Sequence, residues 1–274
     1  MEHPDWWAPW APDENYRLWR GSRPLLISLP HDGSEIPPAI AEKMTEAARM
    51  APDTDWHVGQ LYDFARASGY SVLRPRWSRY VVDLNRPPDG AALYPGKSET
   101  GLCPTSTFAS ESIYRTGQEP QAPEIQARVE RYWRPYHAAL AGAVAEMRTQ
   151  SDQVLLWEGH SIVGTCPLFF AGRLPDYNLG TADGGSCSPE LQSVLEACLR
   201  QANVDHAVNG RFKGGYITRR HGQPASGVHA VQMELAQSNY MDEGAPFNYR
   251  SDRAEGVQQV LRGLLEPALT VIES

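Results

Sequence analysis

Two short apolar runs, each followed by a histidine, constrain this chain more than any other feature of its sequence. The first run occupies residues 24–30 and leads into His31, and the second occupies residues 154–159 and leads into His160. Short apolar runs that end in proline or glycine are typical of strands buried in a parallel sheet. Because ligands bind beyond the carboxyl ends of the strands in open α/β sheets, we expect both imidazoles to face one crevice.

Strand-like and helix-like segments alternate along the chain, which predicts the α/β class and a single domain over residues 1–274. Residues 1–20 are expected to pack on the surface. Long loops, which in compact domains are often functional, are expected at 87–121 and 209–227. We expect strands at 24–29, 70–73, 80–84, 154–159, 204–208 and 228–235, and helices at 37–50, 56–68, 125–147, 188–201 and around 257–265.

The net charge of −8 at pH 7 argues against nucleic acid as a partner, although a local group of arginines still permits a small acidic substrate. The four cysteines are widely spaced and form neither a disulfide framework nor a zinc-finger pattern. The first residues do not resemble a signal peptide, and no apolar stretch is long enough to span a membrane. We therefore expect a cytoplasmic protein without a membrane partner.

His31 and His160 are candidate metal ligands, because two histidines and one carboxylate, with a position left for water, form a catalytic zinc site. Gly33, two residues after the first histidine, lets the backbone turn sharply and approach a ligand closely. Taken alone, each histidine is equally well explained as the cap of a turn or helix. Their similar placement on separate strands favours the metal hypothesis for the pair.

Four carboxylates compete for the third ligand position. Asp55 can reach the site from the start of a helix, although its alternative role is a simple N-cap. Glu35 lies near His31, but the H-x-x-E spacing is absent because position 34 is serine. Asp32 is adjacent to His31 and can orient its ring, and Glu158 lies on the same side of its strand as the second histidine, but deeper.

Two polar segments are candidates for binding an anion. Asn85 and Arg86 end an expected strand and offer planar donors that suit a carboxylate, with Arg79 in the same lining. Their alternative role is a surface ion pair with a nearby aspartate. The segment 209–221 is rich in glycine and basic residues, so backbone amides and cations can converge on an anion unless it is a solvated loop. Its candidate residues are Arg211, Lys213, Tyr216 and Arg219.

Glu234 is the candidate general base. It lies between Met233 and Leu235 in an expected strand, and apolar neighbours often raise the pKa of a carboxyl group. Alternation along the strand places Glu234 on the more polar face, which suits a crevice. The alternative is the solvent-exposed face of an edge strand.

Eight stretches together resemble one family, the N-formylglutamate amidohydrolases of histidine breakdown. They are 28–33 (SLPHDG), 54–57 (TDWH), 78–88 (SRYVVDLNRPP), 101–105 (GLCPT), 133–137 (WRPYH), 159–161 (GHS), 209–219 (NGRFKGGYITR) and 227–237 (GVHAVQMELAQ). Because these stretches extend through most of the chain, the resemblance is more specific than a single short pattern.

The resemblance implies a fold similar to that of the zinc carboxypeptidases, with a mixed, mostly parallel central sheet and helices on both faces. It also implies one zinc ion, or another divalent metal, held by His31, His160 and a carboxylate. For that carboxylate we select Asp55, which lies in one of the matching stretches.

The same resemblance implies that Asn85 and Arg86 bind a substrate carboxylate and that Glu234 is the base. The implied reaction is hydrolysis of N-formyl-L-glutamate, a small dicarboxylate, to L-glutamate and formate. The alternatives are an amidase for another N-acyl amino acid and a non-catalytic protein that binds an anion or a metal.

Overall fold

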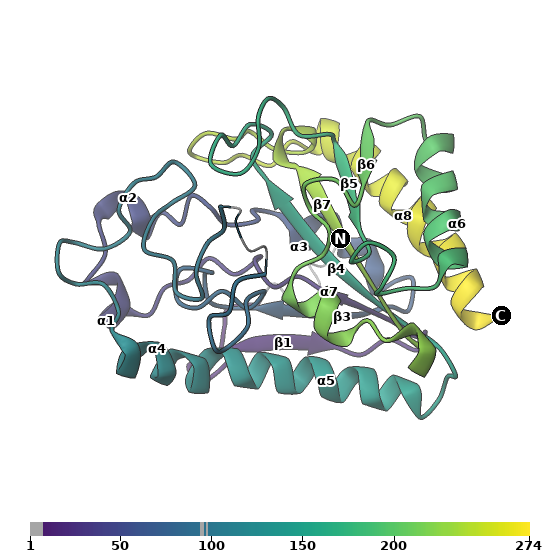
Figure 1. Ribbon diagram of the computed structural model, residues 1–274, viewed down its shortest axis with the longest axis horizontal. Helices are drawn as coiled ribbons and strands as arrows, with labels where there is room; N and C mark the ends of the chain where they lie inside the picture. Colours follow the sequence, from purple (N-terminus) through teal and green to yellow (C-terminus); the bar gives the residue numbers. More distant parts are fainter. Residues whose placement is uncertain (1–7, 94–95, 97) are drawn as a thin grey trace.

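Seven strands form one sheet in the part of the chain that this computed structural model describes, residues 8–93, 96 and 98–274. The strands are β1 (Tyr16–Trp19), β2 (Leu25–Ser28), β3 (Ser71–Pro75), β4 (Val154–Ile162), β5 (Tyr177–Gly180), β6 (His206–Val208) and β7 (Val228–Ala236). Their order across the sheet is β1-β3-β2-β4-β7-β5-β6 (Figure 1).

The sheet is mixed and mostly parallel, which confirms the predicted fold class. β2 pairs in parallel with β3 and β4, β4 with β7, and β5 with β6. β1 runs antiparallel to β3, and β5 runs antiparallel to β7. From β2 the chain moves outward to β3 and then crosses to β4 on the other side of β2. Such a reversal leaves a crevice at the carboxyl ends of the two strands where it occurs.

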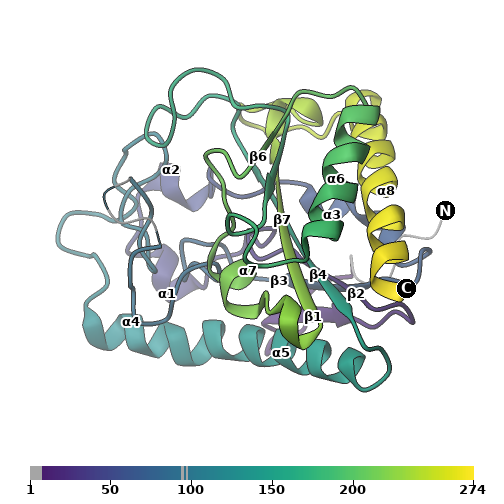
Figure 2. The same cartoon turned by 45° about the vertical axis from the view of Figure 1, so that its right-hand side comes forward.

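The central strands bury alternate residues in two hydrophobic layers. Leu155 and Trp157 of β4 pack into the layer that contains α3 (Val58–Leu61), α6 (Pro189–Gln201) and α8 (Ser251–Glu273). Val154 and Leu156 face the other layer, which contains α1 (Pro38–Ala41), α2 (Glu46–Arg49), α4 (Ala122–Arg128) and α5 (Arg134–Arg148). Figure 2 shows α6 and α8 together on one side of the sheet and α5 along the other. Helices therefore cover both faces, as predicted.

Two helices are shorter than the sequence pattern predicts. The 37–50 segment forms two short helices, α1 and α2, because the Thr45 side chain accepts a hydrogen bond from Ala48 N and starts a new helix. The 56–68 segment forms α3 and a short 3₁₀ turn at Asp63–Ala65. His57 has a left-handed backbone with φ of 64°, so α3 does not extend toward the N-terminus.

The predicted strand at 80–84 is wrong, because this segment forms turns and irregular backbone. Side chains from the helical layer form hydrogen bonds with its carbonyl groups. Arg128 donates to Val81 O at 3.1 Å, and His137 Nε2 bonds to Leu84 O at 2.8 Å. Between α4 and α5 the helix contains one π-turn, Val129–Trp133, a feature that often lies near functional sites.

The other predicted elements are confirmed. Most of their boundaries shift by a few residues, but the helix expected around 257–265 extends over Ser251–Glu273 as α8. Some elements were not expected. β5 and α7 (Tyr216–His221) arise within segments that were predicted to be loops or left unassigned. β1 arises within the predicted surface segment 1–20, of which residues 1–7 lie outside the described residues. Within the described ranges, no helix has both the length and the apolar character needed to cross a membrane.

Candidate functional site

A polar pocket lies at the carboxyl edge of β2, β4 and β7, next to the reversal of strand order. Its wall combines the turn after β2, the 79–86 segment, the two longer strands and three loops. The residues that line it are His31, Arg79, Asn85, Arg86, Glu99, Phe108, His160, Ser161, Ile162, Phe169, Arg211, Phe212, Gly215, Gln232 and Glu234. Both histidines therefore face one crevice, as expected from the sequence.

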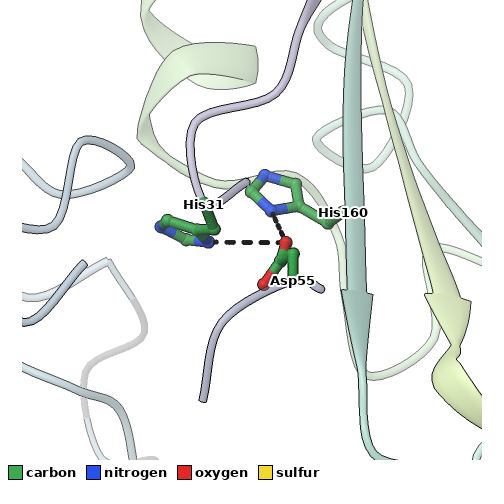
Figure 3. Close-up of side chains that lie close together, drawn as sticks. All are labelled: His31, Asp55 and His160. Carbon is green, nitrogen blue, oxygen red and sulfur yellow. Dashed lines mark hydrogen bonds and ion pairs between the residues drawn. The ribbon is translucent and has the colours of Figure 1, made fainter. Parts of the chain in front are cut away.

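His31, Asp55 and His160 converge beside this pocket (Figure 3). Asp55 Oδ2 lies 2.9 Å from His160 Nδ1 and 3.7 Å from His31 Nδ1. The two imidazole rings are 4.7 Å apart between their centres. All three side chains are buried, and one donor atom from each lies within 4.8 Å of the others. Two histidines and one carboxylate are the ligand set of a catalytic zinc site.

Hydrogen bonds to the backbone hold this group together. Asp55 N donates to His31 O at 3.1 Å, which joins the turn after β2 to the segment before α3. Ser161 N, next to His160 in β4, donates to Asp55 Oδ2 at 3.1 Å. The N-cap residue of α3 is His57, so the alternative role of Asp55 as a simple N-cap is wrong.

Each histidine contacts a second carboxylate through its other ring nitrogen. Asp83 Oδ1 lies 2.7 Å from His31 Nε2, and Glu158 Oε1 lies 2.7 Å from His160 Nε2. A carboxylate in this position accepts the Nε2 proton and fixes the orientation of the ring. In the tautomer that carries its proton on Nε2, each ring turns its Nδ1 lone pair toward Asp55, which is the arrangement that a metal ligand requires.

At 2.9 Å, either a proton or a metal ion must lie between His160 Nδ1 and the Asp55 carboxylate. A lone pair and a carboxylate oxygen at 2.9 Å would otherwise repel each other. Burial lowers the pKa of His160, but hydrogen bonds to Asp55 and Glu158 outweigh burial and bring this pKa well above its usual range. A proton on His160 and a bound metal ion would therefore compete for the same position.

The charges around the site keep its two aspartates ionised. The pKa of Asp83 lies well below its usual range, because His31 and Arg79 outweigh the opposing effect of burial. The pKa of Asp55 is also lowered against burial, mainly by His31 and His160. The pKa of His31 is lowered by burial and by the Arg79 guanidinium. A neutral histidine and ionised carboxylates are the forms that bind a metal.

The other three candidates for the third ligand do not lie between the two histidines. Asp32 forms an ion pair with Arg74 at 2.8 Å and does not orient the neighbouring histidine. Glu35 pairs with Arg76 at 2.8 Å, and its side chain is 45% exposed. Glu158 contacts His160 Nε2, the ring nitrogen that points away from Asp55, so it orients the ring.

Asp83 is the residue of the candidate site that reasoning from the sequence missed. It lies 52 residues from His31 along the chain, and proximity in sequence favoured Asp32 instead. The expected strand at 80–84 and the 78–88 stretch both marked its segment, but they drew attention to Asn85 and Arg86.

Glu234 faces the pocket from β7, directly beside His160 in the ladder between β4 and β7. Because β7 lies between β4 and β5, the alternative of a solvent-exposed edge strand is wrong. Burial raises the pKa of Glu234 to about 8, although the charge of His160 acts in the opposite direction. A buried carboxyl group with a raised pKa beside a candidate metal site suits a general base.

Four of the predicted anion-binding residues line the pocket, namely Arg79, Asn85, Arg86 and Arg211. Arg79 is tied to the acidic group by its ion pair with Asp83 at 2.7 Å. The Asn85 side-chain oxygen accepts a hydrogen bond from Ile217 N at 2.9 Å, which joins the 79–86 segment to α7. Gly215 permits this approach, because a Cβ atom there would lie 2.3 Å from the Asn85 amide.

The other three predicted residues of the basic segment do not line the pocket. Lys213 forms an ion pair with Asp183 at 2.8 Å. Arg219 Nε donates to Gly214 O at 2.8 Å. Tyr216 packs against the aromatic side chains of α5. The loop before α7 contributes residues to the pocket wall and then turns into the helix, which carries later side chains away from the pocket.

Comparison with known proteins gives the same segments a family context. A family model described as N-formylglutamate amidohydrolase matches residues 23–241. N-formylglutamate deformylases of Pseudomonas aeruginosa and Pseudomonas putida are 49% and 48% identical over 258 residues, which is 94% of this chain and 97% and 96% of those proteins. The crystal structure of N-formylglutamate amidohydrolase from Ralstonia eutropha JMP134 is similar with a TM-score of 0.79 and 27% identity, over 94% of this chain and 97% of that chain.

Proposed function

Because the chain belongs to the N-formylglutamate amidohydrolase family, we propose that it hydrolyses the formyl amide of N-formyl-L-glutamate to L-glutamate and formate in histidine degradation. The observation that carries the proposal is the convergence of His31, Asp55 and His160 beside Glu234 in an arginine-lined pocket. We also propose a cytoplasmic location, which the four free cysteine thiols support.

The proposed ligands of one zinc ion, or another divalent metal, are His31 Nδ1, His160 Nδ1 and the Asp55 carboxylate. Two features support this choice. Asp83 and Glu158 lie within hydrogen-bond distance of the Nε2 atoms of His31 and His160, and the Nδ1 atoms of both rings face the Asp55 carboxylate, where a cation is favoured. A bound zinc ion supplies a Lewis acid that polarises the formyl carbonyl and lowers the pKa of water toward neutrality.

Glu234 is the proposed general base. It accepts a proton as the water oxygen attacks the formyl carbon, and its pKa of about 8 makes it a stronger base than an exposed glutamate. Negative charge then develops on the formyl oxygen, and Arg79 is the nearby guanidinium that can stabilise it. Glu234 returns the proton to the leaving nitrogen as the C–N bond breaks, so that formate and the free amino group are released.

Arg86 and Asn85 are the proposed contacts for a substrate carboxylate. Arg86 Nε donates to Thr100 O at 2.8 Å, and its NH1 group donates to Asn85 O at 3.1 Å. Trp133 Nε1 donates to Arg86 O at 3.0 Å, which ties the same residue to the π-turn. These contacts fix the guanidinium before substrate arrives and so reduce the entropy lost on binding.

The test is formate release by the purified protein, measured together with its metal content. We expect turnover of N-formylglutamate with about one zinc per chain, and loss of both metal and activity in His31→Ala and His160→Ala. Glu35→Gln removes an exposed carboxylate near the first histidine and should keep both properties. Full metal content and activity in either histidine variant would contradict the metal assignment. Faster turnover of another N-acyl amino acid would instead support the alternative amidase.

A further inference from the structure

Apolar side chains form the part of the pocket wall that lies next to His160. Ile162 follows this histidine by two residues on β4, so both side chains lie on the same face of the strand. Phe108 and Phe169 extend the wall from two loops, and their ring centres lie 5.1 Å apart in an edge-to-face arrangement. All three apolar residues belong to one small hydrophobic cluster, so this part of the wall is packed.

The position of Phe108 is fixed relative to the candidate metal ligands. Its backbone N donates to Asp53 Oδ2 at 2.9 Å, two residues before Asp55. Thr107 N donates to Glu111 O at 2.8 Å, and Glu111 N donates to Thr107 Oγ1 at 3.1 Å, so the chain closes a tight turn around Phe108. Moving the ring away from the site would break these contacts.

The Phe108 ring also covers Arg79, the proposed partner of the formyl oxygen. The guanidinium carbon lies 5.0 Å from the centre of the ring. The same guanidinium pairs with Asp83 at 2.7 Å and has its NH1 group 3.9 Å from Asp55. One arginine side chain therefore contacts both the ring and the acidic residues of the candidate metal site, which places the ring beside the position proposed for the reacting carbonyl group.

The geometry of an amide decides which part of a substrate meets this wall. An acyl carbon carries its oxygen, its nitrogen and one further substituent in a single plane. In the proposed reaction the oxygen faces Arg79, and the nitrogen leads toward the carboxylate that Arg86 and Asn85 bind. The remaining substituent, which is a hydrogen atom in a formyl amide, is directed away from both polar groups and toward the apolar wall.

We propose that Phe108 limits the acyl group of the substrate to formyl. Its ring leaves room for the formyl hydrogen and occupies the space that the methyl group of an acetyl amide would need. Inserting a methyl group among packed side chains forces them into strained positions. The inference rests on the proposed deformylase function and adds to it the residue that excludes other N-acyl substrates.

Kinetics with two substrates that differ by one methyl group test the proposal. N-formyl-L-glutamate and N-acetyl-L-glutamate both release L-glutamate, so one assay serves for both. In Phe108→Ala we expect the ratio of kcat/KM for the acetyl substrate to kcat/KM for the formyl substrate to rise at least roughly 10-fold over the wild-type ratio. The two amides differ in intrinsic reactivity, but this difference is the same in both proteins and cancels in the comparison. An unchanged or lower ratio in the variant, or equal kcat/KM for the two substrates in the wild type, would overturn the proposal.

Phe170→Ala is the matched control, because it removes a ring from the same cluster. Phe170 packs edge-to-face on Phe212, with ring centres 6.2 Å apart, and is not among the residues that line the pocket. We expect this variant to keep the wild-type ratio. A rise as large as that in Phe108→Ala would show that any loosening of the cluster admits the acetyl group, and would overturn the proposal. If Phe108→Ala does not fold, Phe108→Leu keeps an apolar side chain of smaller reach; a higher ratio in that variant supports the proposal, and an unchanged ratio overturns it.

The wild-type enzyme separates this proposal from the proposed function. If metal-loaded wild-type protein releases no L-glutamate from N-formyl-L-glutamate, the proposed function fails. Calorimetric binding of N-formyl-L-glutamate and N-acetyl-L-glutamate to the wild type and to Phe108→Ala then still decides the role of Phe108. Tighter binding of the acetyl compound to the variant than to the wild type, without a matching gain for the formyl compound, supports the size limit. Any other binding result contradicts it.

Discussion

Asp83 and Asp32 offer a matched pair of substitutions that separates the orientation of a metal ligand from the loss of a buried ion pair. Asp83 is fully buried and lies 2.7 Å from both Arg79 and His31 Nε2. Asp32 is 8% exposed and pairs with Arg74 at 2.8 Å. Each aspartate therefore neutralises a largely buried arginine, but it is Asp83 that holds the imidazole.

The expected losses follow from these contacts. Asparagine keeps the shape of aspartate and removes its charge, so Arg79, which is 8% exposed, or Arg74, which is 10% exposed, loses its ion pair with that carboxylate. Breaking a buried ion pair in this way costs about 3–5 kcal/mol of unfolding free energy. A carboxylate that orients a metal-binding histidine contributes roughly 10- to 100-fold to metal affinity. We expect similar destabilisation in Asp83→Asn and Asp32→Asn, with weaker zinc binding only in Asp83→Asn.

Two assays measure these quantities separately. Urea unfolding of the metal-free proteins gives the unfolding free energies, and competition with a chelator of known affinity gives the dissociation constants for zinc. If Asp32→Asn weakens zinc binding as much as Asp83→Asn, or if Asp83→Asn binds zinc as tightly as the wild type, the role assigned to Asp83 is refuted.

Four further predictions concern other residues of the protein. Asp55→Asn should weaken zinc binding by more than the roughly 100-fold typical of a carboxylate that only orients a ligand, whereas Glu35→Gln should not. Competition with a chelator measures both dissociation constants. Weaker zinc binding in Glu35→Gln than in Asp55→Asn would contradict the ligand assignment. Glu234→Gln should keep zinc and lower kcat about 10²- to 10⁴-fold, as steady-state formate release will show; a near-normal kcat would exclude it as the base. Arg86→Ala should raise KM by the equivalent of about 1.5–3 kcal/mol, and an unchanged KM would leave Arg86 a structural role. Burial lowers the pKa of His137 from 6.5 to about 3, so unfolding free energy should be highest above pH 6.5 and fall as the pH drops toward 3. His137→Phe should remove this part of the slope in urea unfolding, and equal slopes in both proteins would contradict the pKa shift.

The strands that build the pocket are predictable because their signal is local. The apolar runs before His31 and His160 mark strands buried on both faces, and the alternation around Glu234 marks a third. Parallel strands place their carboxyl ends together, so the convergence of these side chains follows from the strand assignments. The choice of Asp55 came from family resemblance, since its position before α3 fits an N-cap equally well.

The 80–84 segment shows why local patterns fail. Its apolar residues predict a strand, but its carbonyl groups find partners on the α4–α5 helical layer, including Arg128 and His137. A chain whose carbonyl groups are bonded by distant side chains does not need a neighbouring strand. The same irregular backbone brings Asp83 to His31, a contact that no spacing rule anticipates.

The basic segment shows a second limit. Composition identifies a loop rich in basic residues, but it does not show which of Arg211, Lys213 and Arg219 reaches the pocket. The placement of each side chain depends on where the loop turns into α7 and on which oxygen atoms lie nearby, such as Phe169 O and the Asp183 carboxylate. These partners come from other loops, so the pattern of the segment itself does not contain them.

Anomalous diffraction at the zinc absorption edge, from crystals of zinc-loaded protein, tests the metal assignment most directly. We predict one strong peak in contact with His31 Nδ1, His160 Nδ1 and a carboxylate oxygen of Asp55, with Glu234 facing it from β7. A peak at other side chains, or coordination through the Nε2 atoms in place of Asp83 and Glu158, would contradict the assignment.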